Sequence, residues 1–232
     1  MTNLEVLQVA LRRVGLNTGS TTFKDGARDY LNLIGKDIQS REQWNWLFTS
    51  STFATVASTQ TYSLASDVLT PLSFRNETEN HVIIIKSTQD VDAADPDASI
   101  TGDPRWAAIN GIDSSGAIQV SLYPIPDGVD TIAYRYYRQI PEFTEANDAD
   151  SLNQYYPLVI QPALIYGISS LYRQEKGDDQ GAMIDRNEME RVISIASRQN
   201  ASVQGNRTYR MKRSDDNFAR QFSYYPTEGS LS

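Results

Sequence analysis

The hydrophobic period changes within the stretch Trp44-Asn-Trp46-Leu-Phe48-Thr-Ser-Ser-Thr-Phe53-Ala-Thr-Val-Ala57. Before this stretch, apolar residues recur every three or four positions, which is the period of an amphipathic α-helix. From Thr49 onward, successive side chains alternate with a period of two, which is typical of a β-strand. The stretch therefore predicts a boundary between a helical and a β region.

Two helices are expected upstream of this boundary. Thr2 and Glu5 form a capping-box pattern, and Leu4, Leu7, Leu11 and Val14 then follow at helical spacing until Gly15 offers a stop. A second helix is predicted from about Thr22. Its apolar face carries Phe23, Ala27, Tyr30, Ile34 and Ile38. The short link between the two helices favours an antiparallel pair.

The region downstream is predicted to be β structure up to about residue 140. Short apolar runs bounded by Gly, Pro, Asp or Asn predict strands near residues 60–64, 82–86, 117–123 and 131–138. We expect the last two strands to form a hairpin around Pro124-Ile-Pro126-Asp-Gly128. The aspartate-rich stretch Asp90–Asp103 has no period, so it is predicted to be a surface loop.

The helical period returns after an acidic link at residues 142–151. Ile160, Leu164, Ile168 and Leu171 predict a helix that begins near Pro157, is bent at Pro162 and ends at Gly177. Another helix is expected over residues 179–199. The predicted fold is α+β: a helical bundle built from residues 1–48 and 152–199, an inserted antiparallel β-domain at 49–141, and an extended C-terminal arm at 200–232.

Composition and charge narrow the class of protein. The chain has 232 residues, no cysteine and a net charge of −8, with +2 on residues 200–232 and −10 on the rest. An acidic body argues against a sequence-reading DNA-binding domain, which needs Lys and Arg over most of one face. No apolar run approaches the length of a membrane span. The first helix is charged and does not resemble a secretory signal, so we expect synthesis in the cytoplasm.

Catalytic and metal-binding motifs are not apparent in the sequence. His81 is the only histidine, and at the start of a strand we interpret it as structural or exposed. The run that starts at Asp90 fails as a calcium loop, because Thr101 occupies the position where a bidentate Glu is required. Carboxylate pairs such as Glu142 and Glu145 have no separation that the sequence fixes. No catalytic residue, cofactor or metal ligand is therefore assigned.

Aromatic residues suggest a core and a partner-binding tail. Trp44, Trp46 and Phe48 lie at a spacing typical of core residues, although they also suit stacking on a sugar or base. The tail mixes basic and aromatic residues, which is compatible with a solvated terminus, a nucleic-acid-binding tail or an arm that becomes ordered on a partner. We favour the arm. Its candidate docking residues are Arg207, Tyr209, Arg210, Lys212, Arg213, Phe218, Phe222, Tyr224 and Tyr225.

The order of several packing and turn motifs resembles the head-to-tail adaptor (connector) proteins of tailed bacteriophages. The motifs are Leu4-Glu-Val-Leu7 with Arg12-Arg-Val-Gly15, Trp44-Asn-Trp46-Leu-Phe48-Thr49 with Phe53, Gln60-Thr-Tyr62-Ser-Leu64, Gln119-Val-Ser-Leu-Tyr123-Pro-Ile-Pro126, and Tyr155-Tyr-Pro157. The similarity covers residues 1 to about 199. The Asp90–Asp103 loop has no counterpart in it, and the tail matches in role only.

This resemblance implies a structural virion protein at the head–tail interface. It implies a twelve-subunit ring directly below the portal, a C-terminal arm that docks on the portal, and a tail or nozzle protein bound beneath. Double-stranded DNA would pass through the lumen without sequence-specific binding, and an acidic lumen would not retain phosphates. The alternative is a glycan-binding or muralytic tail protein that uses the aromatic and acidic residues.

Overall fold

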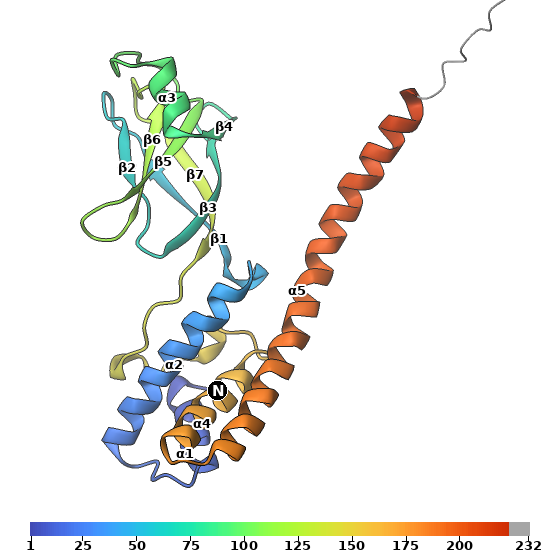
Figure 1. Cartoon of the computed structure of the whole chain (residues 1–232). Coiled ribbons are helices and arrows are strands. Elements are labelled where there is room, and N and C mark those ends of the chain that lie inside the picture. Colours follow the sequence, from blue (N-terminus) through green and yellow to red (C-terminus); the bar gives the residue numbers. More distant parts are fainter. Residues whose placement is uncertain (223–232) are drawn as a thin grey trace, which may run out of the picture. The chain divides into compact units, whose positions relative to one another are not determined.

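The computed structural model describes the backbone of residues 1–222 (Figure 1). It describes the side chains of residues 1–202. The chain divides into two compact units. The helical unit combines Met1–Ile34 with the segment that starts at Asp148, and the β unit comprises Gly35–Asn147. The β unit is thus an insertion in the sequence of the helical unit. Helix α2 (Thr21–Arg41) contributes residues to both.

Helix α1 (Asn3–Arg13) begins and ends as its sequence predicts. The Thr2 hydroxyl accepts a hydrogen bond from the Glu5 amide at 3.2 Å, and the Glu5 carboxylate accepts from the Thr2 amide at 2.9 Å, so the capping box is present. Gly15 follows with a φ of +70°, a conformation that glycine adopts without steric cost. The cap residues therefore set both ends of this helix.

Helix α4 (Gln161–Glu175) begins later than predicted. Two 3₁₀ turns, η2 (Glu145–Asn147) and η3 (Leu152–Gln154), precede it, and Pro157 lies outside the helix. Pro162 occupies the first turn, where a missing amide costs nothing, so the predicted mid-helix bend is wrong. The predicted stop at Gly177 is confirmed, since its φ is +74°.

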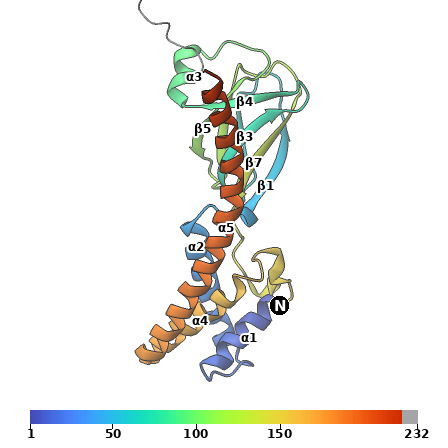
Figure 2. The same cartoon turned by 90° about the vertical axis from the view of Figure 1, so that its right-hand side faces the viewer.

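Helix α5 (Asp179–Phe222) is longer than the helix expected over residues 179–199. Its helical backbone includes residues 200–222, the greater part of the segment predicted as an arm. Within the helical unit, α4 lies against both α1 and α5 (Figure 2). A core of apolar side chains from these helices and α2 is buried, including Leu7, Leu11, Leu31, Leu164 and Ile168.

A close approach between helices occurs at Gly167 of α4. A Cβ atom at this position would lie 2.6 Å from the Ile34 Cδ1 atom and 2.9 Å from the Met189 sulfur. Such distances are far shorter than an ordinary van der Waals contact, so a larger residue would force Ile34 of α2 and Met189 of α5 to shift. This glycine has a packing role rather than a conformational one.

The β unit is a curled seven-stranded sheet. Its strands are β1 (Phe48–Ala54), β2 (Thr61–Ser63), β3 (Val68–Asn76), β4 (His81–Lys86), β5 (Trp106–Ile112), β6 (Ile118–Tyr123) and β7 (Thr131–Arg138), in the order β1-β7-β3-β4-β5-β6-β2. Phe53 of β1 and Tyr62 of β2 stack with ring centroids 5.0 Å apart. This contact brings the two edge strands of the sheet together around the core.

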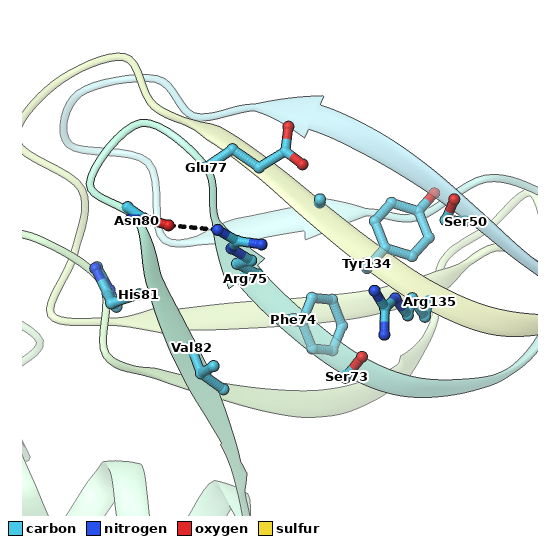
Figure 3. Close-up of a pocket in the computed structure, with 11 residues that line it drawn as sticks. Ser50, Ser73, Phe74, Arg75, Glu77, Asn80, His81, Val82, Tyr134 and Arg135 are labelled. Carbon is cyan, nitrogen blue, oxygen red and sulfur yellow. Dashed lines mark hydrogen bonds between the residues drawn. The ribbon is translucent and has the colours of Figure 1, made fainter.

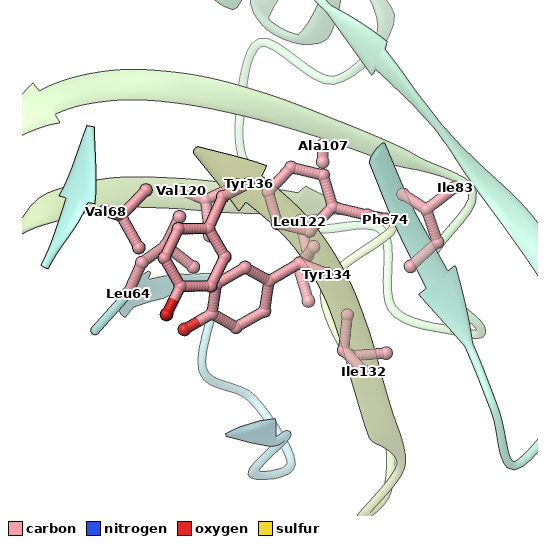
Figure 4. Packing of buried hydrophobic residues seen from close by; sticks show 10 residues of the cluster. All are labelled: Leu64, Val68, Phe74, Ile83, Ala107, Val120, Leu122, Ile132, Tyr134 and Tyr136. Atoms are coloured by element: carbon pink, nitrogen blue, oxygen red, sulfur yellow. The ribbon is translucent and has the colours of Figure 1, made fainter. Parts of the chain in front are cut away.

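The core of the β unit is built from the inward-facing side chains of these strands (Figure 4). Tyr134 stacks on Phe74 and Tyr136, with centroid distances of 5.9 and 5.3 Å. Their hydroxyl groups reach polar partners: Tyr134 accepts from the Ala65 amide, and Tyr136 donates to the Asp67 carboxylate at 3.0 Å. Burial of these large rings is therefore compatible with their polar ends.

The sheet is mixed, so the prediction of an antiparallel β-domain is wrong. Strands β4 and β5 pair in parallel, and helix α3 (Thr88–Ala94) connects them. The predicted Asp90–Asp103 surface loop is also wrong over residues 90–94, because Asp90 is the third residue of this helix. The Ser87 hydroxyl and the Asp90 carboxylate cap it reciprocally. Parallel strands need such a crossover connection.

The predicted hairpin of the last two strands is absent. β6 pairs with β5 and β2, whereas β7 pairs with β1 and β3. The proline-rich turn at residues 124–128 therefore connects strands in different parts of the sheet. Sequence proximity and turn residues favoured a hairpin, but the long-range pairing of β7 with β1 and β3 determines its position.

Candidate interaction surfaces

The predicted docking arm falls largely on α5. Seven of the predicted docking residues belong to the helical backbone of α5, although the structure does not describe their side chains. These residues are Arg207, Tyr209, Arg210, Lys212, Arg213, Phe218 and Phe222. Tyr224 and Tyr225 lie outside the described residues altogether. The role of these nine residues as a docking site stays a prediction.

A pocket of about 560 Å³ lies on the outer face of the β sheet (Figure 3). Strands β1, β3, β4 and β7 and the turn between β3 and β4 contribute to it. Arg135 of β7 pairs in register with Ser50 of β1 and Ser73 of β3, so its guanidinium is flanked by two hydroxyl-bearing residues. Arg75 also lines the pocket and donates a hydrogen bond to the uncharged Asn80 side chain (Figure 3).

The two arginines of this pocket have the chemistry to pair with a negatively charged group. Arg75 and Arg135 are both exposed, and guanidinium groups pair well with carboxylates and phosphates. Glu77 also lines the pocket, and its negative charge reduces the positive potential there. Because the site is open to solvent, any such contact contributes little affinity by itself.

His81, at the start of β4, has a structural position. Its Nε2 lies 2.8 Å from the carbonyl oxygen of Pro104, which requires a proton on Nε2, and 3.5 Å from an Asp103 carboxylate oxygen. Its Nδ1 is buried and has no hydrogen-bond partner among the described residues. With Nε2 committed to a backbone carbonyl, the ring holds the strand to the neighbouring loop, which is the structural role that the sequence favoured.

The acidic residues also serve local structure. Asp95 accepts from the amides of Ser99 and Ile100 at 3.1 and 2.8 Å, so it shapes the loop after α3. Glu142 pairs with Lys36, and this hydrogen bond lowers the pKa of the Glu142 carboxyl group. A glycosidase acid needs the opposite shift. No group of metal-ligating side chains occurs in the described part of the chain.

The aromatic cluster divides into buried and exposed members. Trp44 is fully buried and donates its indole N–H to the carbonyl of Ile38 at 2.7 Å, so its predicted core position is confirmed. Trp46 is half-buried, with its ring 6.0 Å from that of Trp44. Phe48 is exposed and packs edge-on against Tyr137 of β7. The three rings therefore do not form one exposed stacking platform.

The helical unit carries a second surface, which the sequence did not reveal. A groove of about 550 Å³ is lined by Val9, Arg12 and Arg13 of α1 and by Pro162, Ile165 and Tyr166 of α4. The Arg13 guanidinium lies over the Tyr166 ring at 4.7 Å. The two helices are about 150 residues apart in the chain, so no local motif marks this groove.

The described residues thus form an arginine-bearing pocket on the sheet and a partly apolar groove in the helical unit. Residues 1–212 match the SU10 adaptor protein family. The chain therefore belongs to this family of phage head-to-tail adaptors and is a structural component of the virion. Self-assembly and contact with other head and tail proteins follow from this membership.

No curated protein matches the chain. Among the described residues, no helix combines the length and apolar character that a membrane crossing requires.

Proposed function

We propose that this adaptor forms a ring that joins the portal to the tail. The resemblance to phage head-to-tail adaptors implies that the ring has twelve copies. The observation that carries the proposal is the family match over residues 1–212, which includes both units and most of α5. Identical subunits in head-to-tail contact form a closed ring when the rotation between neighbours closes. The duplex would pass through the lumen of that ring.

The acidic body of the chain supports this role. Residues 1–199 carry a net charge of −10, and a lumen bearing such charge repels phosphates instead of retaining them. The protein would act by geometry and contact, without a reaction of its own. In agreement with this, His81 is committed to a backbone carbonyl, so we expect His81→Ala to leave assembly close to normal.

The C-terminal part of α5 is the proposed portal-binding element. Residues 200–232 hold five of the basic residues and a net charge of +2, which complements an acidic partner surface. Their helical backbone up to Phe222 gives an arm of about 30 Å beyond residue 202, at 1.5 Å per residue. A helical arm of this length is long enough to reach a groove on a neighbouring protein.

Truncation tests this assignment. Asn200 is buried, so the deletion should start after Ser202 and leave the packed part of α5 in place. We expect the truncated chain to melt like the full chain but to lose co-sedimentation with purified portal. A full-length variant with Arg207, Arg210, Lys212 and Arg213 changed to Ser should bind more weakly, with the larger loss at low salt. Undiminished portal binding by the truncated chain would exclude the arm.

A further inference from the structure

The groove between α1 and α4 combines an apolar floor with an unneutralised cation. Val9, Ile165 and Tyr166 are half-buried, and Pro162 is exposed beside them. Arg13 is engaged by the buried carboxylate of Asp185. Arg12 is exposed. Among the described residues, its side chain donates one hydrogen bond, from Nε to the carbonyl oxygen of Gln8 in the same helix at 3.3 Å. The groove therefore favours an apolar side chain that is accompanied by a carboxylate.

Helix α2 presents such a combination. Asp25, Asp29 and Leu33 follow one another at intervals of four residues, so they form one stripe along the helix. Leu33 is 58% exposed, although leucine is usually buried, and the Asp25 carboxylate, which pairs with Arg28, is 64% exposed. We call this stripe the α2 ridge. It spans about 12 Å at 1.5 Å per residue.

The ridge and the groove belong to different helices of the helical unit. A neighbouring side of α2 packs on α4: Ile34 contacts the position of Gly167, and the Tyr172 hydroxyl donates to the Phe23 carbonyl at 2.7 Å. The ridge is exposed on α2 beside this contact, whereas the groove is lined by residues of α1 and α4. One copy cannot bring its own ridge into its own groove. Two such complementary patches on one subunit generate head-to-tail contacts.

We propose that the groove receives the α2 ridge of a second copy of this chain, with Leu33 seated between Val9 and Ile165 and Asp29 paired with Arg12. This inference rests on the proposed ring and specifies the contact that closes it. Charge favours a second copy as the occupant, because Asp29 and Arg12 are both exposed and supply opposite charges at an otherwise apolar contact.

The absence of cysteine from the sequence permits a clean cross-linking test. The test uses two single variants, Leu33→Cys and Ile165→Cys, which are mixed and assembled on portal. A short bismaleimide should link the two variants into a covalent dimer. Neither variant should form this dimer without the other. A chain with both substitutions should give a ladder of oligomers. Cross-links between two Leu33→Cys chains would indicate a two-fold contact and overturn the proposal.

Charge exchange provides the second arm of the test. Asp29→Arg and Arg12→Asp should each weaken assembly on portal roughly tenfold, since like charges would face each other across the contact. The chain with both changes should recover assembly. Asp97→Arg, an exposed charge reversal in the β unit, is the matched control and should assemble normally. Unchanged melting temperatures would show that folding is intact.

The outcome separates this contact from the ring itself. A ring seen in assembled particles without the Leu33–Ile165 cross-link would refute the ridge-and-groove contact and leave the ring standing. Isolated copies in the particle would refute the ring.

Discussion

The Arg13 guanidinium, at the end of α1, donates to the Asp185 carboxylate of α5 at 2.6 Å across 172 positions of sequence. The Asp185 side chain is 2% exposed, and Arg173 of α4 donates to its other oxygen at 2.9 Å. A single buried carboxylate thus joins three helices from both ends of the chain. Its removal leaves Arg13 without its carboxylate partner and Arg173 with Asp178 alone, which is the costly way to disturb a buried ion pair.

We therefore expect Asp185→Asn to lower the free energy of unfolding by about 1–3 kcal/mol, because charged hydrogen bonds are lost inside the helical unit. Glu188→Gln is the matched control. Its partner Arg191 lies on the surface of the same helix, so the expected change is below about 1 kcal/mol. Urea unfolding measures both. Equal effects of the two substitutions would argue against a central role for Asp185.

Leu11 and Leu164 are both fully buried in the helical unit, one from each end of the chain. Leu11→Ala and Leu164→Ala should each cost about 2–5 kcal/mol, as truncations in a packed core do. Both should shift the same cooperative transition, which calorimetry can follow. Two melting steps, each sensitive to only one of the substitutions, would show that the chain ends fold separately.

Gly167→Ala should destabilise the helical unit by about 1–3 kcal/mol, although alanine is the better helix former, because the new methyl group overlaps Ile34 and Met189. Ile34→Val removes the Cδ1 atom that lies closest. In a Gly167→Ala background, this second change should recover part of the loss, whereas in the native background it should cost about 1 kcal/mol. Additive losses in the double variant would contradict the close approach.

Tyr136 gives the β unit a dependence on alkaline pH. Burial raises the pKa of its hydroxyl group to about 12, and the hydrogen bond to Asp67 acts in the same direction. In the unfolded chain, the Tyr136 hydroxyl loses its proton near pH 10. The stabilisation that comes from its raised pKa is therefore complete below pH 10 and falls as the pH rises toward 12. Tyr136→Phe should flatten the decline between pH 10 and 12. An unchanged slope in that variant would show that other groups cause it.

Local signals predicted the ends of several elements. The Thr2 and Glu5 capping box and the glycines at 15 and 177 act within one helical turn, and the structure has each where it was expected. The same type of signal at Ser87 and Asp90 was missed, because the surrounding aspartates suggested a loop. The parallel pairing of β4 with β5 could not be predicted, since it depends on contacts across about 20 residues and not on the pattern within either strand.

The interaction surfaces were harder to predict than the fold. Val9 and Ile165 line the same groove although they are about 150 residues apart in the chain. From the sequence alone, an apolar residue such as Leu33 would be expected in the core, but it is exposed. Only the packed structure shows that α2 turns this leucine outward. The arginines of the sheet pocket, Arg75 and Arg135, likewise come together only through the register of β3 and β7.

A reconstruction of the assembled phage particle tests the central claim most directly. We predict density for this chain as a closed ring between portal and tail, with the duplex in its lumen and the C-terminal part of α5 against the portal. Isolated copies on the outer surface of the tail would contradict the account.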